Sequence, residues 1–218
     1  AILAGAVDAH GLPRKVAPGT NAAFRNAPGA DHVSIKGLTL SNFENGIVLI
    51  QADTLNTARP VTAFRAGSTG WRIENLTFQD CFFGVVASGR HEDLAVRRCI
   101  FHMKLWNESK SRVGSIAVSV RPLPPLYRGL PYRVDIDENE IHGPADPSAD
   151  AALSGIVVTA DSARVTRNTI DGYRIGIVCE GQGLVVGRNT ITDGTIGIVA
   201  WNTGVLGTLL HAGDTVFS

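Results

Sequence analysis

The stretch "VTRNTIDGYRIGIVCEGQGLVVGRNTITDGTIGIVAWN", residues 165–202, contains one pattern twice. Five residues of the first copy recur 21 positions later, as the pairs Val165/Val186, Asn168/Asn189, Ile170/Ile191, Gly176/Gly197 and Ile177/Ile198. A fixed period of this length is typical of solenoids, in which each repeat is one unit that stacks on the next. The sequence therefore predicts a stack of similar coils.

Earlier parts of the chain repeat the same pattern with wider spacing. Further copies begin at Val33, Trp71, Leu94 and Tyr132, so that the frame occurs six times. Insertions separate them at residues 51–68, 103–113, 121–131 and 144–153. A weaker match between "AAFRNAPG" and "TAFRAGSTG" indicates one more coil before Val33, which gives about seven coils.

Aligning the copies predicts which side chains face inward. Apolar residues alternate with polar ones, as expected of half-buried strands. One predicted inward column contains Ile35, Ile73, Val96, Ile136, Val165 and Val186, and a second contains Leu40, Phe78, Phe101, Ile141, Ile170 and Ile191. Between them, a bend column ends in Asn139, Asn168 and Asn189, for which we expect the left-handed backbone of a sharp bend and stacked side chains. A third strand opens at Gly46, Gly84, Ser115, Gly155, Gly176 and Gly197.

Composition excludes several classes of protein. Lys plus Arg equals Asp plus Glu at 20 each, so we expect no nucleic-acid partner. No apolar run reaches the length of a transmembrane helix, so we expect no membrane insertion. Three cysteines (Cys81, Cys99 and Cys179) without CxxC spacing argue against a metal knuckle and a disulfide scaffold.

The repeat "VxIxxNxIxxxxxGIxV", which residues 30–202 follow, resembles that of the pectin-lyase-like superfamily. The resemblance implies an all-β, right-handed parallel β-helix with three short strands per coil. We expect a single domain over 1–218, with a first coil and entry region at 1–32, regular coils at 33–202 and a terminal coil or cap at 203–218. Calcium is the cofactor that the resemblance suggests, through a faint likeness of "VRPLPPLYRGLPYR" to a pectate lyase segment. We assign no metal-ligating residues.

Outward positions of the second strand predict a candidate active site. His102, His142 and Asp171 should stack on successive coils, beside the insertions at 103–113 and 144–153. Removing the proton beside a uronate carboxylate needs a base and a neighbouring cation, for which Lys104 and Arg112 are candidates. We therefore predict catalytic roles for the two histidines and Asp171. The alternative is a polar ladder of stacked side chains, or adventitious metal binding.

A second set of charged residues faces outward on the first strand and its bend. Lys36, Glu74, Arg97 and Asp137 alternate in sign one coil apart, which predicts cross-strand salt bridges without any further function. The alternative is a role in substrate binding, for which we select Arg97, Asp137, Glu140 and Arg167.

The third strand predicts an apolar outer stripe that contains Val48, Val86, Val157, Val178 and Val199, with Ala117 at the corresponding position of the third coil. A contiguous apolar patch of this kind fits a homo-oligomer contact or a flanking domain. The high strand propensity of valine is the alternative explanation.

Together, these patterns predict an extracytoplasmic protein that acts on polysaccharide and is secreted, periplasmic or located at the cell surface. The leading hypothesis is a lyase or C5-epimerase that acts on an acidic polysaccharide, ahead of a hydrolase. The alternative is a noncatalytic β-helix module for carbohydrate binding, adhesion or structural spacing. The fold does not choose between them.

Overall fold

The computed structural model describes residues 1–5, 21–26, 30–50, 68–104, 107–108, 111–112, 115–122, 130–144, 154–201, 209–212 and 215–216. For 107–108, 111–112, 201, 209–212 and 215–216 it describes only the backbone. The described part of the chain is all-β and contains no helix. The insertions expected at 51–68, 121–131 and 144–153 lie largely outside these residues.

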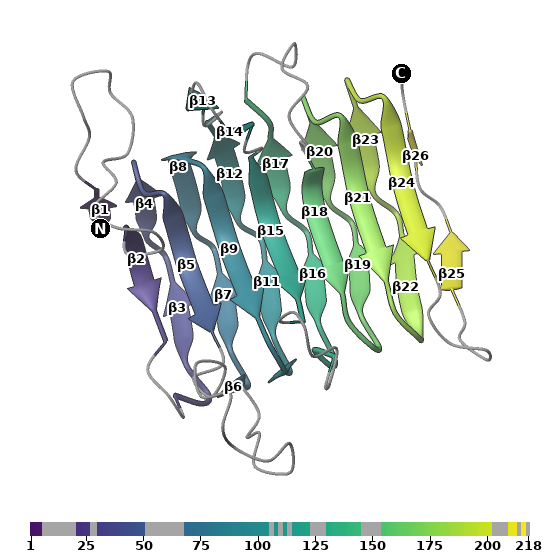
Figure 1. The fold of residues 1–218 in the computed structure, drawn as a ribbon, viewed down its shortest axis with the longest axis horizontal. Coiled ribbons are helices and arrows are strands. Elements are labelled where there is room, and N and C mark those ends of the chain that lie inside the picture. The colour runs from purple at the N-terminus through teal and green to yellow at the C-terminus, as the bar shows by residue number, and fades with distance from the viewer. Residues whose placement is uncertain are drawn as a thin grey trace.

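Three parallel sheets form the molecule (Figure 1). Sheet 1 contains β3 (Ser34–Lys36), β7 (Arg72–Glu74), β11 (Ala95–Arg97), β16 (Asp135–Asp137), β19 (Arg164–Thr166), β22 (Leu184–Gly187) and β25 (Leu209–Ala212). Sheet 2 contains β1 (Ile2–Ala4), β4 (Thr39–Ser41), β8 (Thr77–Cys81), β12 (Ile100–Met103), β17 (Glu140–His142), β20 (Thr169–Asp171), β23 (Thr190–Thr192) and β26 (Thr215–Val216). Sheet 3 contains β2 (Ala22–Arg25), β5 (Asn45–Ile50), β9 (Phe83–Ser88), β15 (Ile116–Arg121), β18 (Ser154–Thr159), β21 (Ile175–Glu180) and β24 (Ile196–Trp201).

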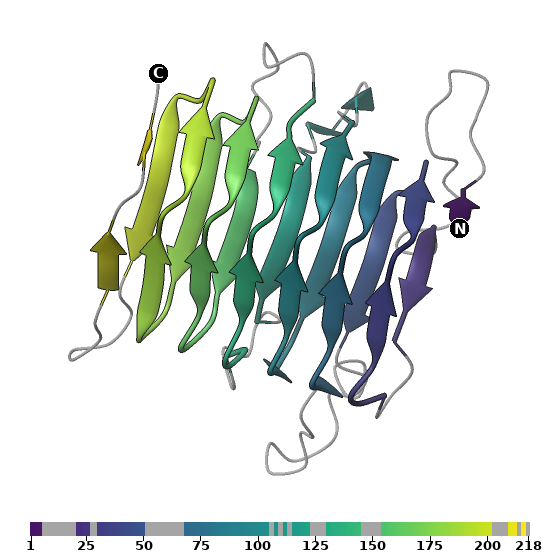
Figure 2. The ribbon, with the colours of Figure 1, turned by 180° about the vertical axis from the view of Figure 1, so that it is seen from behind.

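From β3 onward the chain visits sheets 1, 2 and 3 in turn and then returns to sheet 1. Sheet 3 lies on one side of the molecule, and sheets 1 and 2 follow one another on the other side (Figures 1 and 2). Two short pairs complete the described strands: β6 (Ser68–Thr69) with β10 (His91–Glu92), and β13 (Asn107–Glu108) with β14 (Ser111–Arg112). This arrangement is compatible with a parallel β-helix.

The interior consists of the columns that the repeat predicted. In sheet 1, the pairing aligns Ile35, Ile73, Val96, Ile136, Val165 and Val186, and all six side chains are buried. In sheet 2, it aligns Leu40, Phe78, Phe101, Ile141, Ile170 and Ile191. The rings of Phe78 and Phe101 stack with centroids 4.5 Å apart. Both inward columns are therefore confirmed.

An asparagine ladder joins the coils at the bend between sheets 1 and 2. Asn168 Nδ2 donates to Ile136 O at 3.0 Å and to Asn189 Oδ1 at 2.9 Å. Asn168 Oδ1 accepts hydrogen bonds from the main-chain N–H and from Nδ2 of Asn139. Asn139 and Asn189 likewise donate to main-chain carbonyl groups, those of Val96 and Val165. The predicted stacking of these side chains is confirmed.

The left-handed residue of this bend is not the asparagine, however. Positive φ angles of 51° to 66° occur one position earlier in each coil, at Gly37, Asn75, Arg98, Glu138, Arg167 and Arg188. A left-handed backbone is unfavourable for residues other than glycine. The left-handed conformation turns the chain so that the next side chain, such as Asn168, points into the interior. At the coils with asparagine, hydrogen bonds of the ladder offset the energetic cost of this backbone conformation. The expectation that asparagine takes this conformation was wrong.

Sheet 3 corrects the predicted register of one coil. Val85 pairs with Val118 and Val86 with Ser119, so Ala117 rather than Ser115 occupies the glycine column and Ser119 rather than Ala117 belongs to the outer column. At Gly84 a Cβ atom would lie 2.4 Å from Ala117 O and 2.6 Å from the Phe101 ring, which explains why this column is otherwise glycine. The two-residue shift from Ser115 to Ala117 could not be predicted, because the insertion at 103–113 interrupts the 21-residue spacing just before this strand.

We predict that Asn168→Leu lowers the free energy of unfolding by about 1 to 3 kcal/mol, because donors of Asn139 and the carbonyl of Ile136 lose a buried partner. The adjacent Thr169 is exposed, so Thr169→Leu serves as the control and should change this energy by less than about 0.5 kcal/mol. Urea denaturation measures both. Equal stability of the two variants would contradict the ladder.

A second prediction concerns His91, the buried first residue of β10, whose ring contacts Ser68 of β6 and Ser88 of β9. Its Nδ1 lies 2.8 Å from Ser68 Oγ and its Nε2 lies 3.1 Å from Ser88 O, and burial lowers its pKa. The unfolded chain, with an ordinary histidine pKa of about 6.5, therefore binds the proton more readily. Stability should fall as the pH drops below about 6.5, by up to about 1.4 kcal/mol per pH unit from this group. Denaturation of His91→Gln between neutral and acidic pH should show a shallower slope; an unchanged slope would contradict this role.

Candidate functional site

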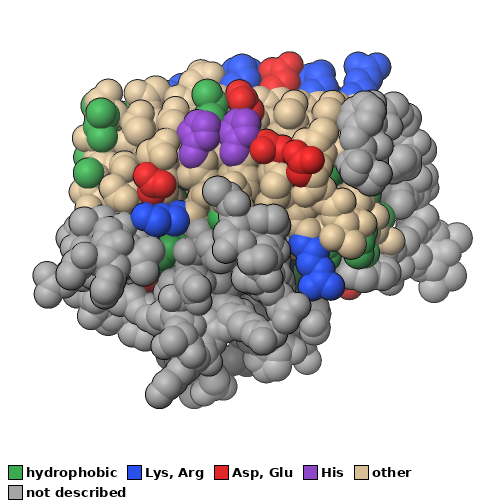
Figure 3. Space-filling model, turned by 90° about the horizontal axis from the view of Figure 1, so that it is seen from above, with side chains coloured by type: hydrophobic (Ala, Val, Ile, Leu, Met, Phe, Trp, Pro, Cys, Tyr) green, Lys and Arg blue, Asp and Glu red, His purple; other side chains and the backbone are tan. Residues whose placement is uncertain are grey.

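Three neighbouring strands of sheet 2 carry the predicted histidine column. Pairing of β12, β17 and β20 places His102 opposite His142 and His142 opposite Asp171. All three side chains point outward, because their neighbours Phe101, Ile141 and Ile170 point into the core. Figure 3 shows two histidines side by side on this face, bordered by acidic side chains. The predicted proximity of these residues is confirmed.

His142 occupies the centre of this cluster. Its ring stacks on that of His102, with centroids 4.8 Å apart and planes inclined by 7°. Its Nδ1 lies 2.6 Å from Asp171 Oδ1, and its Nε2 lies 2.8 Å from Glu140 Oε1. The cluster thus fixes the position and orientation of His142.

The two histidines therefore differ in what they can do chemically. Both ring nitrogens of His142 lie within hydrogen-bonding distance of carboxylate oxygens, so neither is directed at a substrate. His102 is exposed, and among the described residues its ring contacts that of His142. Of the pair, His102 is the one whose nitrogen can accept a proton from a bound molecule. Glu140, predicted to bind substrate, is the carboxylate that contacts Nε2 of His142.

The predicted cations lie on the segment that follows β12. Lys104 comes two residues after His102, and its main-chain N–H donates to Cys81 O at 3.0 Å. The chain then forms the hairpin of β13 and β14, in which Arg112 pairs with Asn107 (Figure 1). The side chain of Arg112 lies outside the described residues, as do residues 145–153 of the other insertion.

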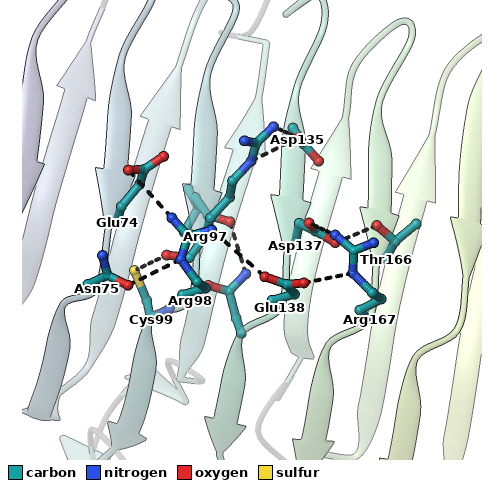
Figure 4. A network of polar contacts seen from close by, with 12 residues as sticks. Glu74, Asn75, Arg97, Arg98, Cys99, Asp135, Asp137, Glu138, Thr166 and Arg167 are labelled. Atoms are coloured by element: carbon teal, nitrogen blue, oxygen red, sulfur yellow. Dashed lines mark hydrogen bonds and ion pairs between the residues drawn. The ribbon is translucent and has the colours of Figure 1, made fainter.

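Arg97, Asp137 and Arg167 belong to a different network, on the outer face of sheet 1 and its bend (Figure 4). Arg97 pairs with Asp135, which raises the pKa of the arginine. Arg167 pairs with Asp137 and, at 3.2 Å, with Glu138, and Thr166 Oγ1 donates to Asp137 Oδ1 at 2.7 Å.

The same charged network extends to the strands of sheet 1 that come earlier in the chain. Lys36 Nζ lies 2.8 Å from Glu74 and lowers the pKa of this carboxyl group, chiefly through a hydrogen bond. Arg98 lies between Glu74 and Glu138, at 3.7 and 3.8 Å. Of the salt bridges predicted along the column of Lys36, Glu74, Arg97 and Asp137, the pair Lys36–Glu74 forms. Arg97 instead pairs with Asp135, and Asp137 with Arg167. Arg97, Asp137 and Arg167 therefore lie on another sheet than the histidine cluster and are not brought to it.

The valine stripe of sheet 3 is partly buried within the chain itself. Pairing aligns Val48, Val86, Ser119, Val157, Val178 and Val199. Val48 and Val157 are each 4% exposed, whereas Val86, Val178 and Val199 are half-buried. The apolar surface left for a partner is therefore smaller than the sequence alone indicates.

The cysteines are unsuited to catalysis. Cys81, Cys99 and Cys179 are free and buried, and burial raises the pKa of Cys81 and of Cys99 to about 11. A thiol of this kind is not a nucleophile near neutral pH. In the described part of the chain, no three residues among His, Cys, Asp and Glu are grouped so that they could hold a metal ion.

No protein-family model, curated protein or solved structure matches this chain. Among the described residues, no helix has the length and apolar character to cross a membrane. A functional assignment therefore depends on the chemistry of the chain's own side chains.

The network of sheet 1 predicts a structural role for Asp137, which is 5% exposed and accepts hydrogen bonds from Thr166 and Arg167. We expect Asp137→Ala to lower the free energy of unfolding by about 1 to 3 kcal/mol. Lys36→Ala removes the exposed partner of Glu74, which keeps Arg98 as a second cation, and should cost less than about 1 kcal/mol. Thermal and urea denaturation of both variants check this difference, and an Asp137→Ala protein as stable as the parent would show that the network contributes nothing to the fold.

Proposed function

We propose that the chain is a single-domain, right-handed parallel β-helix of about seven coils, with the pectin-lyase-like architecture that its repeat resembles. The cyclic order of the three sheets and the ladder at one bend support this proposal. An interior of stacked columns is a rigid scaffold, and loops on such scaffolds often carry function.

We propose further that the protein works outside the cytoplasm on an acidic polysaccharide, as a lyase or C5-epimerase. One observation carries the proposal: an exposed histidine, His102, is held by stacking on a second histidine whose own orientation two carboxylates fix. A base whose neighbours are locked in this way is preorganised for proton transfer. The hairpin of β13 and β14 rises next to it along the chain.

The chemistry assigns His102 the role of general base. Its free nitrogen takes the proton from carbon 5 of a uronate, and the electron pair of the broken C–H bond moves toward the adjacent carboxylate to give an enolate. In a lyase, this pair then forms the C4–C5 double bond while the bond from carbon 4 to the glycosidic oxygen breaks, and the leaving oxygen takes up a proton from water. In an epimerase, carbon 5 instead receives a proton from water on its opposite face. Lys104 and Arg112 are the proposed cations for the carboxylate, and a calcium ion is the alternative.

A noncatalytic module is the second candidate, favoured by a specific observation. His142, Asp171 and Glu140 satisfy one another, so this part of the column is also complete as a structural ladder. In that case the same face would bind carbohydrate without changing it, or the β-helix would serve as a structural spacer. A homo-oligomer or flanking-domain contact at the half-buried valines of sheet 3 belongs to this second proposal.

The two functions predict different behaviour of His102→Ala. If His102 is the base, this variant should lose at least about 100-fold in product formation from polyuronates, since general-base catalysis contributes about 100- to 10,000-fold. Thr192→Ala, in the same outward column three coils away, is the control and should keep its activity. Ultraviolet absorbance of the unsaturated product detects a lyase, and proton exchange at carbon 5, followed by NMR, detects an epimerase.

The outcomes separate the candidates. Product formation that survives His102→Ala contradicts the assignment of the base. Binding of polyuronates by the parent protein without any product or exchange favours the noncatalytic module. Absence of both binding and product across neutral and acidic polysaccharides would contradict both proposals.

A further inference from the structure

A depression of about 250 Å³ lies on the outer face of sheet 1, away from the histidine cluster. Four arginines line it: Arg72, Arg97, Arg133 and Arg164. Two aspartates, Asp93 and Asp135, also line it, so four positive charges face two negative ones and leave an excess of two. Such a concentration of guanidinium groups is unusual on a protein whose net charge is zero.

The depression results from one small side chain in an outward column. Pairing of β7, β11, β16 and β19 aligns Arg72, Ala95, Asp135 and Arg164. Ala95 ends at its Cβ, whereas the long side chains on either side extend outward, so the surface is hollow above it. Asp93, at the corner before β11, and Arg133, at the corresponding corner before β16, also line the depression.

The aspartates hold two of the guanidinium groups in place. Nε and Nη2 of Arg97 both donate to Asp135 Oδ2, and Arg133 Nη2 lies 2.8 Å from Asp93 Oδ2. Arg164 is less constrained, since its Nε is 3.9 Å from Asp135 Oδ1, beyond hydrogen-bonding distance. This Asp135 oxygen is buried, and no described residue forms a hydrogen bond with it.

An exposed aromatic ring borders the arginines. Tyr132 is 42% exposed, and the Arg133 guanidinium carbon lies 5.1 Å from the centroid of its ring. Within the described residues it is the one exposed Tyr, Phe or Trp side chain. Guanidinium groups bind carboxylate and sulfate groups in fixed geometry, and an aromatic ring offers an apolar face for a sugar ring.

We propose that this depression binds one acidic sugar residue, with its carboxylate or sulfate among the arginines and its ring against Tyr132. The volume suits a single residue rather than a longer segment. The choice of a sugar rests on the proposed function, whereas the affinity for an anionic group rests on the arginines alone. The strands that build the depression belong to the same coils as His102, His142 and Asp171, so one polysaccharide chain can approach both faces.

Calorimetric titration with three probes tests the proposal: a short oligogalacturonate, a sulfated oligosaccharide and inorganic sulfate. The double variant Arg133→Gln/Arg164→Gln should bind each acidic oligosaccharide at least about tenfold more weakly than the parent. Arg98→Gln/Arg174→Gln removes the same charge from exposed positions outside the depression and is the matched control. Raising the salt concentration from about 0.05 M to about 0.5 M should weaken binding by the parent.

Tyr132→Ala distinguishes an acidic sugar from a bare anion. It should weaken binding of the oligosaccharides and leave binding of inorganic sulfate unchanged. Equal binding by the parent and Arg133→Gln/Arg164→Gln would overturn the proposal. A parent protein that binds none of the three probes, or that binds inorganic sulfate but neither oligosaccharide, would also overturn it. Arg164→Gln alone, which breaks no hydrogen bond given above, repeats the test should the double variant fail to fold.

This test is independent of catalysis. If His102→Ala abolishes product formation but keeps oligosaccharide binding, both proposals stand. If no product forms from any polymer while the arginine variants still lose binding, the acidic-sugar site stands and the enzyme assignment fails.

Discussion

The side chain of one asparagine joins two neighbouring coils, and the remaining structure depends on this interaction. Asn168 donates to the main-chain carbonyl of Ile136 in the preceding coil and to Asn189 in the following coil, and it accepts from Asn139, so that three successive coils share one buried chain of hydrogen bonds. A slip of one residue in any of these coils would leave these buried groups without partners, which is costly. The ladder therefore fixes the register of both sheets that meet at the bend.

This register explains the outer surface as well as the interior. The strands of sheet 2 begin immediately after the ladder, so a fixed bend places His102 beside His142 and His142 beside Asp171. In sheet 1, just before the ladder, the same alignment brings Arg97 and Asp135 onto adjacent strands around the hollow above Ala95. Two chemically different faces thus result from one constraint.

The sequence predicts the columns well, because strand alternation and a constant repeat length determine which residues of different coils are neighbours. It did not predict Glu140 as a partner of His142, since alternation shows only that both face outward and not that their side chains meet. The register error at Ala117 has another origin: the glycine is replaced in the coil where an insertion also interrupts the repeat. The left-handed conformation of Arg167 could not be predicted, because the position is not a glycine. Hydrogen bonds of the next residue, Asn168, offset the energetic cost of this conformation.

NMR of the side-chain amides tests the central claim most directly. If the coils stack in this register, the Nδ2 protons of Asn139, Asn168 and Asn189 should exchange slowly with solvent, since all three residues are 2% exposed or less. Nuclear Overhauser effects should then connect the amide of Asn139 to that of Asn168, and the amide of Asn168 to that of Asn189. Rapid exchange at these amides, without contacts between coils, would contradict the ladder and the register on which both surface sites depend.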